Sequence, residues 1–131
     1  MSRKRTAVTK KKAAVRSAPR RMRSLKVSDG FKAFVLDQLA ELGEVMPRAM
    51  FGGVGLYHRG VFFGIIARDT LYLKVGDTNC ADYESAGMKP FKPYADRPGT
   101  MRYCAVPLDI LESPIDLARW ARAAIAVAER T

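Results

Sequence analysis

The chain has 131 residues, 48% of them hydrophobic, and carries a formal net charge of +10 at pH 7. This length suits one globular domain of ordinary size and leaves little room for two. No apolar run approaches the roughly 20 residues that a membrane-spanning helix needs. The large positive charge points first to nucleic acid as a partner.

The positive charge is confined to the N-terminal end of the chain. Residues 1–26 hold 11 Lys or Arg and no acidic residue, whereas the rest of the chain holds 12 basic and 13 acidic residues. Few large apolar side chains accompany the basic ones, so we predict a disordered tail over residues 1–27 and one domain over residues 28–131.

Counterion release would draw this tail to nucleic acid, where it would contact phosphates and read no sequence. A transit peptide ranks lower because the basic residues come in blocks, and an incidental tail stays open as an alternative. The cations that would make the contacts are Arg3, Lys4, Arg5, Lys10, Lys11, Lys12, Arg16, Arg20, Arg21, Arg23 and Lys26.

The first predicted helix begins at Ser28 or Asp29, either of which can cap free N–H groups. Gly43 is placed to end it in a left-handed conformation. Between them, apolar residues recur at spacings of three and four, as on one face of a helix, at Phe31, Phe34, Val35, Leu39 and Leu42.

Residues 45–76 are predicted to form an antiparallel meander. Strands over 54–58, 61–67 and 71–75 are joined by the short turns Arg59-Gly60 and 68–70, and 45–51 is an edge segment interrupted by Pro47. The segment 61–67 is apolar on both faces, which predicts two covers. One cover would be the chain's own helices and the other a partner subunit, so Phe62 and Ile66 are the expected face of a homodimer.

The remaining elements complete a single α+β domain. A short helix over 79–86 follows a cap at Asp77 or Thr78, and 88–100 is predicted as a loop. A strand over 101–106 precedes a last helix that begins at Ser113-Pro114. The expected order is α-β(3-4)-α-β-α, with a mostly antiparallel sheet.

No catalytic, metal or cofactor site is recognisable. His58 is the only histidine, and Cys80 and Cys104 lack the spacing of zinc ligands or a disulfide framework. We therefore expect a non-enzyme without cofactors in the reducing cytoplasm. The glycine cluster at 51–55 precedes a strand, which favours a bulge or close backbone approach over a phosphate loop. The aromatic residues are expected to pack in the core or an interface, because few basic residues accompany them in the sheet, mainly Arg68 and Lys74.

One string of residues resembles the signature of the TfoX/Sxy N-terminal domain family. It runs over residues 48–57, and the similarity continues to about residue 129. The residues that carry the motif are Arg48, Met50, Phe51, Gly52, Gly53, Gly55, Leu56 and Tyr57.

The resemblance implies a regulatory domain with no established catalytic residues. Two-domain members of this family regulate natural competence and promote transcription alongside a cyclic-AMP receptor protein. They carry a C-terminal helical domain for which this sequence has no room.

Three hypotheses follow from the sequence. The favoured one is a non-catalytic regulatory or interaction module whose tail binds nucleic acid non-specifically. Its protein partner is unknown, and the transcription machinery is one candidate. The second is a protein-binding adaptor with an incidental tail. The third is an enzyme or small-ligand carrier with a site that the sequence does not reveal.

Overall fold

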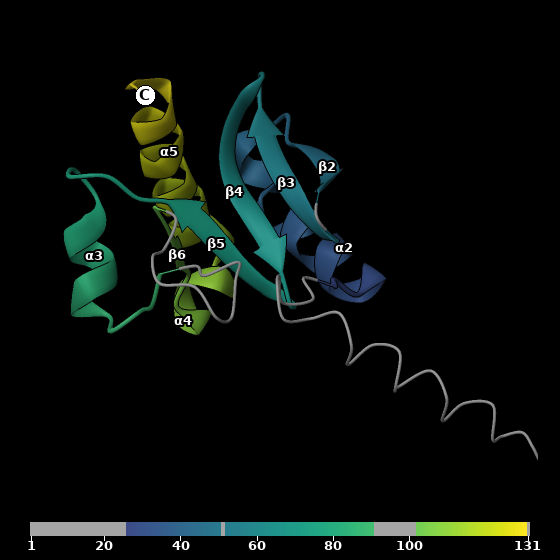
Figure 1. The fold of residues 1–131 in the computed structure, drawn as a ribbon, viewed down its shortest axis with the longest axis horizontal. Helices are drawn as coiled ribbons and strands as arrows, with labels where there is room; N and C mark the ends of the chain where they lie inside the picture. The colour runs from purple at the N-terminus through teal and green to yellow at the C-terminus, as the bar shows by residue number, and fades with distance from the viewer. Residues whose placement is uncertain (1–25, 51, 91–101, 131) are drawn as a thin grey trace, which may run out of the picture.

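The computed structural model of the chain describes residues 26–50, 52–90 and 102–130 (Figure 1). The tail residues 1–25, Phe51 and most of the predicted 88–100 loop therefore lie outside the described residues. The elements, in chain order, are α2 (Asp29–Gln38), the 3₁₀ turn η1 (Ala40–Leu42), β2 (Met46–Met50), β3 (Gly53–His58), β4 (Val61–Ala67), β5 (Thr70–Lys74), α3 (Cys80–Ser85), β6 (Tyr103–Ala105), α4 (Leu108–Leu111) and α5 (Pro114–Arg130).

The α+β fold expected from the sequence is confirmed. The strands form one five-stranded antiparallel sheet in the order β2-β3-β4-β5-β6, so each strand pairs with its neighbours in the sequence. Strand β2 is an edge strand, as Pro47 predicted, and the short α4 was not anticipated. None of the helices in the described ranges is long and apolar enough to span a membrane.

Local sequence signals set most element boundaries. The Ser28 hydroxyl accepts a hydrogen bond of 3.2 Å from the Phe31 amide and caps α2. Gly43 ends the 3₁₀ turn that follows, with a φ of +90°. At the start of α5, the Ser113 hydroxyl accepts from the Asp116 amide.

The two hairpins of the meander have turns of the same kind. Arg59 and Gly60 join β3 to β4 with φ values of 52° and 82°. Arg68 and Asp69 join β4 to β5 with φ values of 50° and 52°. Positive φ at both central residues is the type I′ geometry, whose twist matches that of antiparallel strands.

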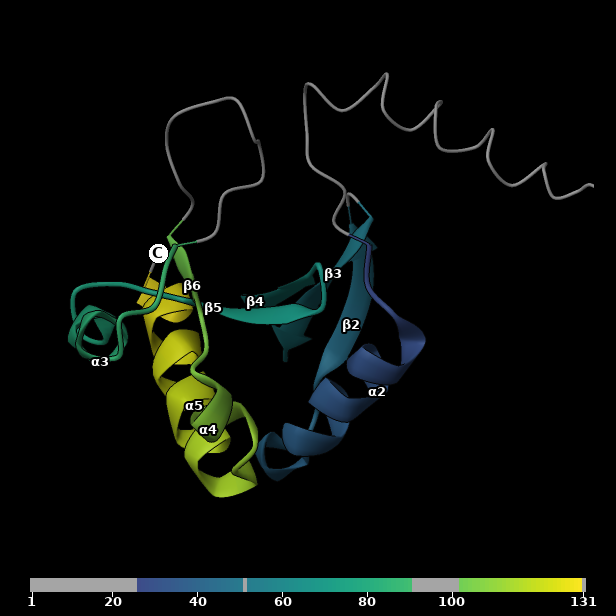
Figure 2. The same ribbon diagram turned by 90° about the horizontal axis from the view of Figure 1, so that it is seen from below.

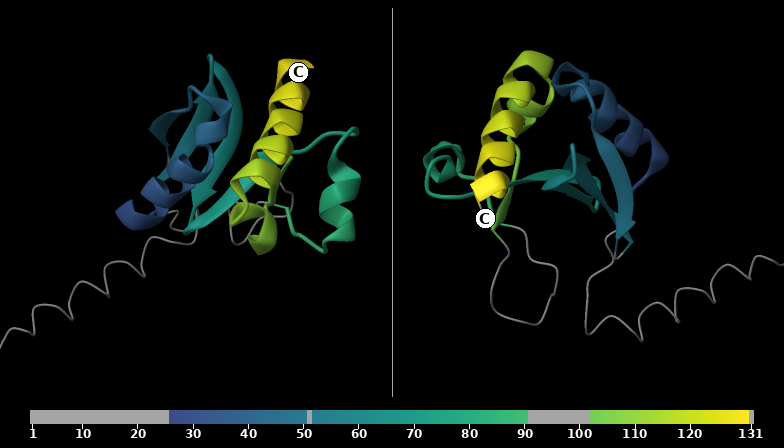
Figure 3. Two further views of the ribbon diagram at one scale, coloured as in Figure 1. Left: turned by 180° about the vertical axis from the view of Figure 1, so that it is seen from behind. Right: turned by 90° about the horizontal axis from the view of Figure 1, so that it is seen from above.

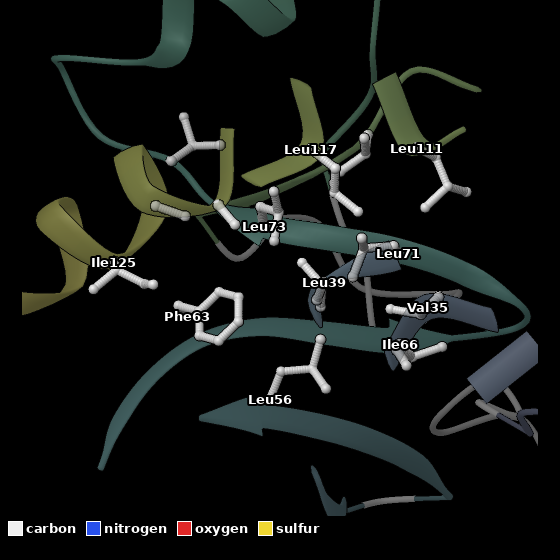
Figure 4. Packing of buried hydrophobic residues seen from close by; sticks show 14 of the residues in the cluster. Val35, Leu39, Leu56, Phe63, Ile66, Leu71, Leu73, Leu111, Leu117 and Ile125 are labelled. Atoms are coloured by element: carbon white, nitrogen blue, oxygen red, sulfur yellow. The ribbon is translucent and has the colours of Figure 1, made fainter. Parts of the chain in front are cut away.

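Helices α2 and α5 cover one face of the sheet and enclose the main core. Figures 2 and 3 show both helices on the same side of the strands, with the sheet curving around them. In Figure 4 the side chains of this core meet between the two layers. The largest fully buried ones include Leu39, Leu56, Phe63, Ile66, Leu71, Leu73 and Leu117.

A register shift in β4 corrects one expectation. Leu56 pairs with Gly64 whereas Tyr57 pairs with Phe62, so Phe63 is the extra residue of a β-bulge. The bulge reverses the alternation of side chains along the strand. As a result Ile66 lies in the main core, fully buried, whereas Phe62 lies on the opposite face. The expectation that Phe62 and Ile66 share one face is therefore wrong.

Candidate binding surface

The face of the sheet opposite α2 and α5 carries a second apolar cluster. Its members come from β4, β5 and β6, and no helix in the described part of the chain covers them (Figure 2). We call this surface the helix-free face. Its cluster consists of the buried residues Ile65, Ala67, Tyr72 and Tyr103, with Phe62 and Ala105 packed against them.

A row of aromatic rings crosses the helix-free face at right angles to the strands. Tyr57 of β3 stacks on its cross-strand partner Phe62 of β4, with ring centroids 5.0 Å apart and planes at 25°. Phe62 in turn contacts Tyr103 of β6 at 5.6 Å. Such ring pairs stabilise beyond the area that they bury, by about 0.5–1.5 kcal/mol each.

A cation closes the aromatic row at each end. The guanidinium of Arg48, on edge strand β2, lies 5.6 Å from the centre of the Tyr57 ring. At the other side of the sheet, the ammonium of Lys74 on β5 lies 5.2 Å from the centre of the Tyr103 ring. Both distances fall within the range of cation–π attraction. We call the five side chains the aromatic row: Arg48, Tyr57, Phe62, Tyr103 and Lys74.

Gly55, at the centre of β3, has no side chain, and this leaves room for the side chains of Met50 and Phe62 on the helix-free face. A Cβ atom built on Gly55 would lie 2.7 Å from Cε of Met50 and 3.1 Å from Cε1 of Phe62. The side chain of Met50 therefore fills the place of the missing Cβ. The family motif is thus explained in part by packing, since Arg48, Met50, Gly55 and Tyr57 share the helix-free face.

Two hollows lie at the two ends of the aromatic row. The first has a volume of about 460 Å³ and is bounded by Arg48, Tyr57 and Arg59, with Glu44 as its acidic residue. The second, of about 350 Å³, lies beside Lys74 where the end of β5 meets α5. It is lined by Lys74, Arg102 and the α5 residues Val127 and Arg130, with Asp77 as its acidic residue. Volumes of this size suit small ligands or single groups of a larger one.

The hollows concentrate positive charge on a domain that is otherwise acidic. Together they are lined by five basic and two acidic side chains. The rest of the described chain carries six Lys or Arg against ten Asp or Glu. A carboxylate oxygen of Asp77 lies 3.8 Å from a guanidinium nitrogen of Arg102 in an exposed ion pair. Such exposed pairs are weak, so the other cations of the hollows keep their attraction for anions.

Burial and neighbouring groups change the acidity of side chains around the row. Burial, followed by the influence of Tyr57, raises the pKa of Tyr103 to about 12. Burial also raises the pKa of the Tyr83 hydroxyl, which packs edge-on against Trp120. The pKa of the Cys104 thiol is raised mainly by burial, and such a shift disfavours the reactive thiolate.

The single histidine, the two cysteines and the glycine cluster singled out in the sequence have structural surroundings that can be described one by one. The Nδ1 atom of His58 lies 2.8 Å from the carbonyl oxygen of Glu44 and ties the β3 end to the segment before β2. Cys80 and Cys104 are both free thiols. Within residues 26–50, 52–90 and 102–130, no three His, Cys, Asp or Glu side chains converge as a metal site would require. The glycine cluster lies at the β2–β3 turn, where Gly52 has a φ of 85°.

Sequence reasoning missed the aromatic row for two reasons. It weighed the aromatic residues against Arg68 and Lys74 and left out Arg48, because the motif at 48–57 was treated as a signature rather than as a strand pair. The pairing of Tyr57 with Phe62 was also overlooked, although the two-residue turn at Arg59-Gly60 sets it. The alternation of Met46, Arg48 and Met50 along β2 was the signal that could have revealed the surface.

The geometry describes an α+β domain with a row of aromatic rings on one face of its sheet. Comparison with known proteins places this domain in a family. The TfoX N-terminal domain family matches residues 37–128, which is more than half of the chain. The chain therefore belongs to the TfoX N-terminal domain family.

A curated relative shares part of this region. The DNA transformation protein TfoX1 of Aliivibrio fischeri (strain ATCC 700601 / ES114) is 36% identical over 52 residues, which is 40% of this chain. The aligned stretch spans 25% of the length of that relative.

Proposed function

We propose that the chain is a non-catalytic regulatory or interaction module of the kind found in competence regulators, attached to nucleic acid through its basic tail. Family membership and the relative's name, which refers to DNA transformation, support the regulatory part. The segregation of charge supports the attachment, because residues 1–26 hold 11 basic and no acidic residues. That charge segregation is the single observation that carries the nucleic-acid assignment.

The absence of a chemical centre from the described residues supports a non-catalytic role. A nucleophilic thiol needs a neighbouring base that is itself held in place. The Nδ1 atom of His58 is engaged with a backbone carbonyl, and no ion pair or hydrogen bond of the described structure joins His58 to Cys80 or Cys104. We place the protein in a reducing compartment, the cytoplasm, because two free thiols suit one.

The decisive experiment measures binding of the full chain to duplex DNA over a salt series. The matched variant replaces all 11 tail cations with Gln and leaves residues 27–131 unchanged. Each phosphate contact that the tail makes should contribute about −0.9 to the slope of log K against log salt concentration. We expect a steep slope for the natural chain and a nearly flat one for the variant. Equal duplex affinities for the two proteins at physiological salt would disprove the anchor.

A protein-binding adaptor is the second candidate, and one observation favours it. Leu108 of α4 and Ile115 of α5 are 65% and 70% exposed, although both are large apolar side chains. A contiguous exposed apolar patch is typical of protein contacts, and both residues belong to the segment where α4 is followed by α5. Co-purification of the same partner with the natural chain and the tail variant, lost on Leu108→Ser/Ile115→Ser, would support the adaptor.

A further inference from the structure

The aromatic row differs from an ordinary apolar patch in having charges at both of its ends. The ring of Tyr57 is partly exposed, and the guanidinium that lies over it belongs to the exposed Arg48. An Arg on an exposed strand can move from the ring to an anion at little cost, since it gives up only a surface cation–π contact. A flat aromatic group could then take its place on the Tyr57 ring.

The first hollow provides the room for such a group. It adjoins the Tyr57 ring and is bounded by two guanidinium groups, those of Arg48 and Arg59. A ligand that fits this set has a flat π-system to stack on tyrosine and an anionic group to pair with arginine. A nucleotide unit has both, because every base has a π-face and is joined to a phosphate.

The second hollow lies where a longer ligand would continue. From β2 to β6 the row crosses four strand spacings, or about 19 Å. At the far side, Lys74 belongs both to the row and to the second hollow, where Arg102 and Arg130 add two further cations. A polymer with anions at regular intervals can reach both hollows, whereas one small ligand fills only one.

We propose that the helix-free face binds single-stranded nucleic acid, which crosses the strands from the Arg48–Arg59 hollow to the Lys74–Arg102 hollow with a base stacked on Tyr57. The site combines cations with aromatic rings on an antiparallel sheet, where the rings of Tyr57 and Phe62 are partly exposed, which is the pattern of sequence-tolerant single-strand binding. A duplex does not fit, because its bases are stacked on one another and offer the protein no free π-face. The site does not depend on the tail.

Charge complementarity favours nucleic acid over the other occupants of such a face. The two hollows hold three more basic than acidic side chains, on a described domain with eleven basic and twelve acidic residues in all. A second copy of the chain would bring the same cations against themselves if its helix-free face docked here. Like charges placed opposite each other cost association energy.

The test uses the full chain with its 11 tail cations replaced by Gln, so that tail contacts do not mask the sheet. A fluorescent single-stranded DNA of about 15 nucleotides is titrated at several salt concentrations, and a duplex of equal length serves as the comparison. We expect measurable binding to the single strand at low salt and at least tenfold weaker binding to the duplex. No single-strand binding at low salt, or equal binding to the two, overturns the proposal.

Two variants locate the site on that background. Tyr57→Leu removes the stacking ring and should weaken single-strand binding about 5- to 150-fold, the range for losing one stacked base. Arg48→Gln/Lys74→Gln removes one cation at each end and should make the salt slope shallower by about 1.4, at 0.7 per contact. The matched control Lys32→Gln/Arg122→Gln removes two cations from α2 and α5, on the covered side, and should leave affinity unchanged.

The results of these measurements distinguish single-stranded nucleic acid from a second copy of the chain as the partner of the helix-free face. If the control variant weakens binding as much as Arg48→Gln/Lys74→Gln, the attraction is diffuse and the proposal fails. If the natural chain self-associates through this face and Arg48→Gln/Lys74→Gln leaves single-strand affinity intact, the occupant is a second copy instead. Should Tyr57→Leu fail to fold by circular dichroism, the charge variant still decides, because Arg48 and Lys74 make surface contacts only. Amide shifts on adding DNA that concentrate in β2 to β6 and are absent from α2 would confirm the location.

Discussion

Gly76, in the turn after β5, is predicted to accept a larger residue only at a loss of stability, because of one neighbour on α5. A Cβ atom at Gly76 would lie 2.8 Å from Cγ1 and 3.3 Å from Cγ2 of Val127. Valine in a helix has one strongly preferred side-chain rotamer, so it cannot turn away. We expect Gly76→Ala to lower the free energy of unfolding by about 1–3 kcal/mol, the usual cost of overpacking.

A double-mutant cycle measures this contact directly. Val127→Ala removes two methyl groups and should cost about 1.5–2 kcal/mol by itself. It also clears the space for a Cβ at Gly76, so the double variant should be no less stable than Val127→Ala alone. The coupling energy should therefore equal the cost of Gly76→Ala, with opposite sign.

The assay is urea unfolding followed by circular dichroism, with thermal unfolding as a second reading. A loss of 1–3 kcal/mol corresponds to a fall in Tm of about 5–20 °C for a domain of this size. Gly30→Ala is the control, because nothing lies within 4 Å of its Cβ position in α2 and alanine favours helices. Additive effects of Gly76→Ala and Val127→Ala would refute the reasoning, because they would show that Val127 does not set the limit.

Three further predictions concern polar groups. Asn79→Ala should cost about 1–3 kcal/mol in urea unfolding, because its buried amide bonds the backbone at both ends of the turn after β5; a loss below about 0.5 kcal/mol would contradict this. Stability should be complete below about pH 10 and fall toward pH 12, because the pKa of Tyr103 is raised from 10.0 to about 12 and the unfolded chain loses that proton first. Tyr103→Phe should make this fall shallower by on the order of 2 kcal/mol, and an identical pH profile would disprove it. Ser28→Ala should cost about 1 kcal/mol through loss of the α2 cap, whereas Ser28→Gly should cost only a few tenths.

Structural features that are set by a few consecutive residues, such as helix caps and turns, were predictable from the sequence. The cap at Ser28, the start of α5 at Ser113-Pro114 and the Arg59-Gly60 turn were all expected from local residue chemistry. The second turn was expected over residues 68–70 and is one residue shorter, because Thr70 begins β5. The meander followed from them, since turns of two residues force adjacent strands to pair. The fold class could therefore be derived without any knowledge of the core.

Features that depend on strand register were not predictable. The bulge at Phe63 adds one residue to β4, and no local signal in an all-apolar strand marks where such a residue lies. One residue of slip moves every later side chain to the other face. The prediction that Ile66 faces a partner failed for this reason, whereas the pairing of Tyr57 with Phe62 is set by the Arg59-Gly60 turn and could have been derived from it.

The position of α5 in the chain has a consequence for synthesis on the ribosome. Strands β3, β4 and β5 emerge well before residues 114–130, yet Leu117, Ala121 and Ala124 of α5 are fully buried against the sheet and its neighbours. Until that helix leaves the exit tunnel, the inner face of the nascent sheet lacks the cover that α5 provides. Folding of this domain to the native state therefore waits until residues 114–130 have been synthesised, and a chain that stalls before residue 114 would present an apolar β-surface to chaperones and proteases.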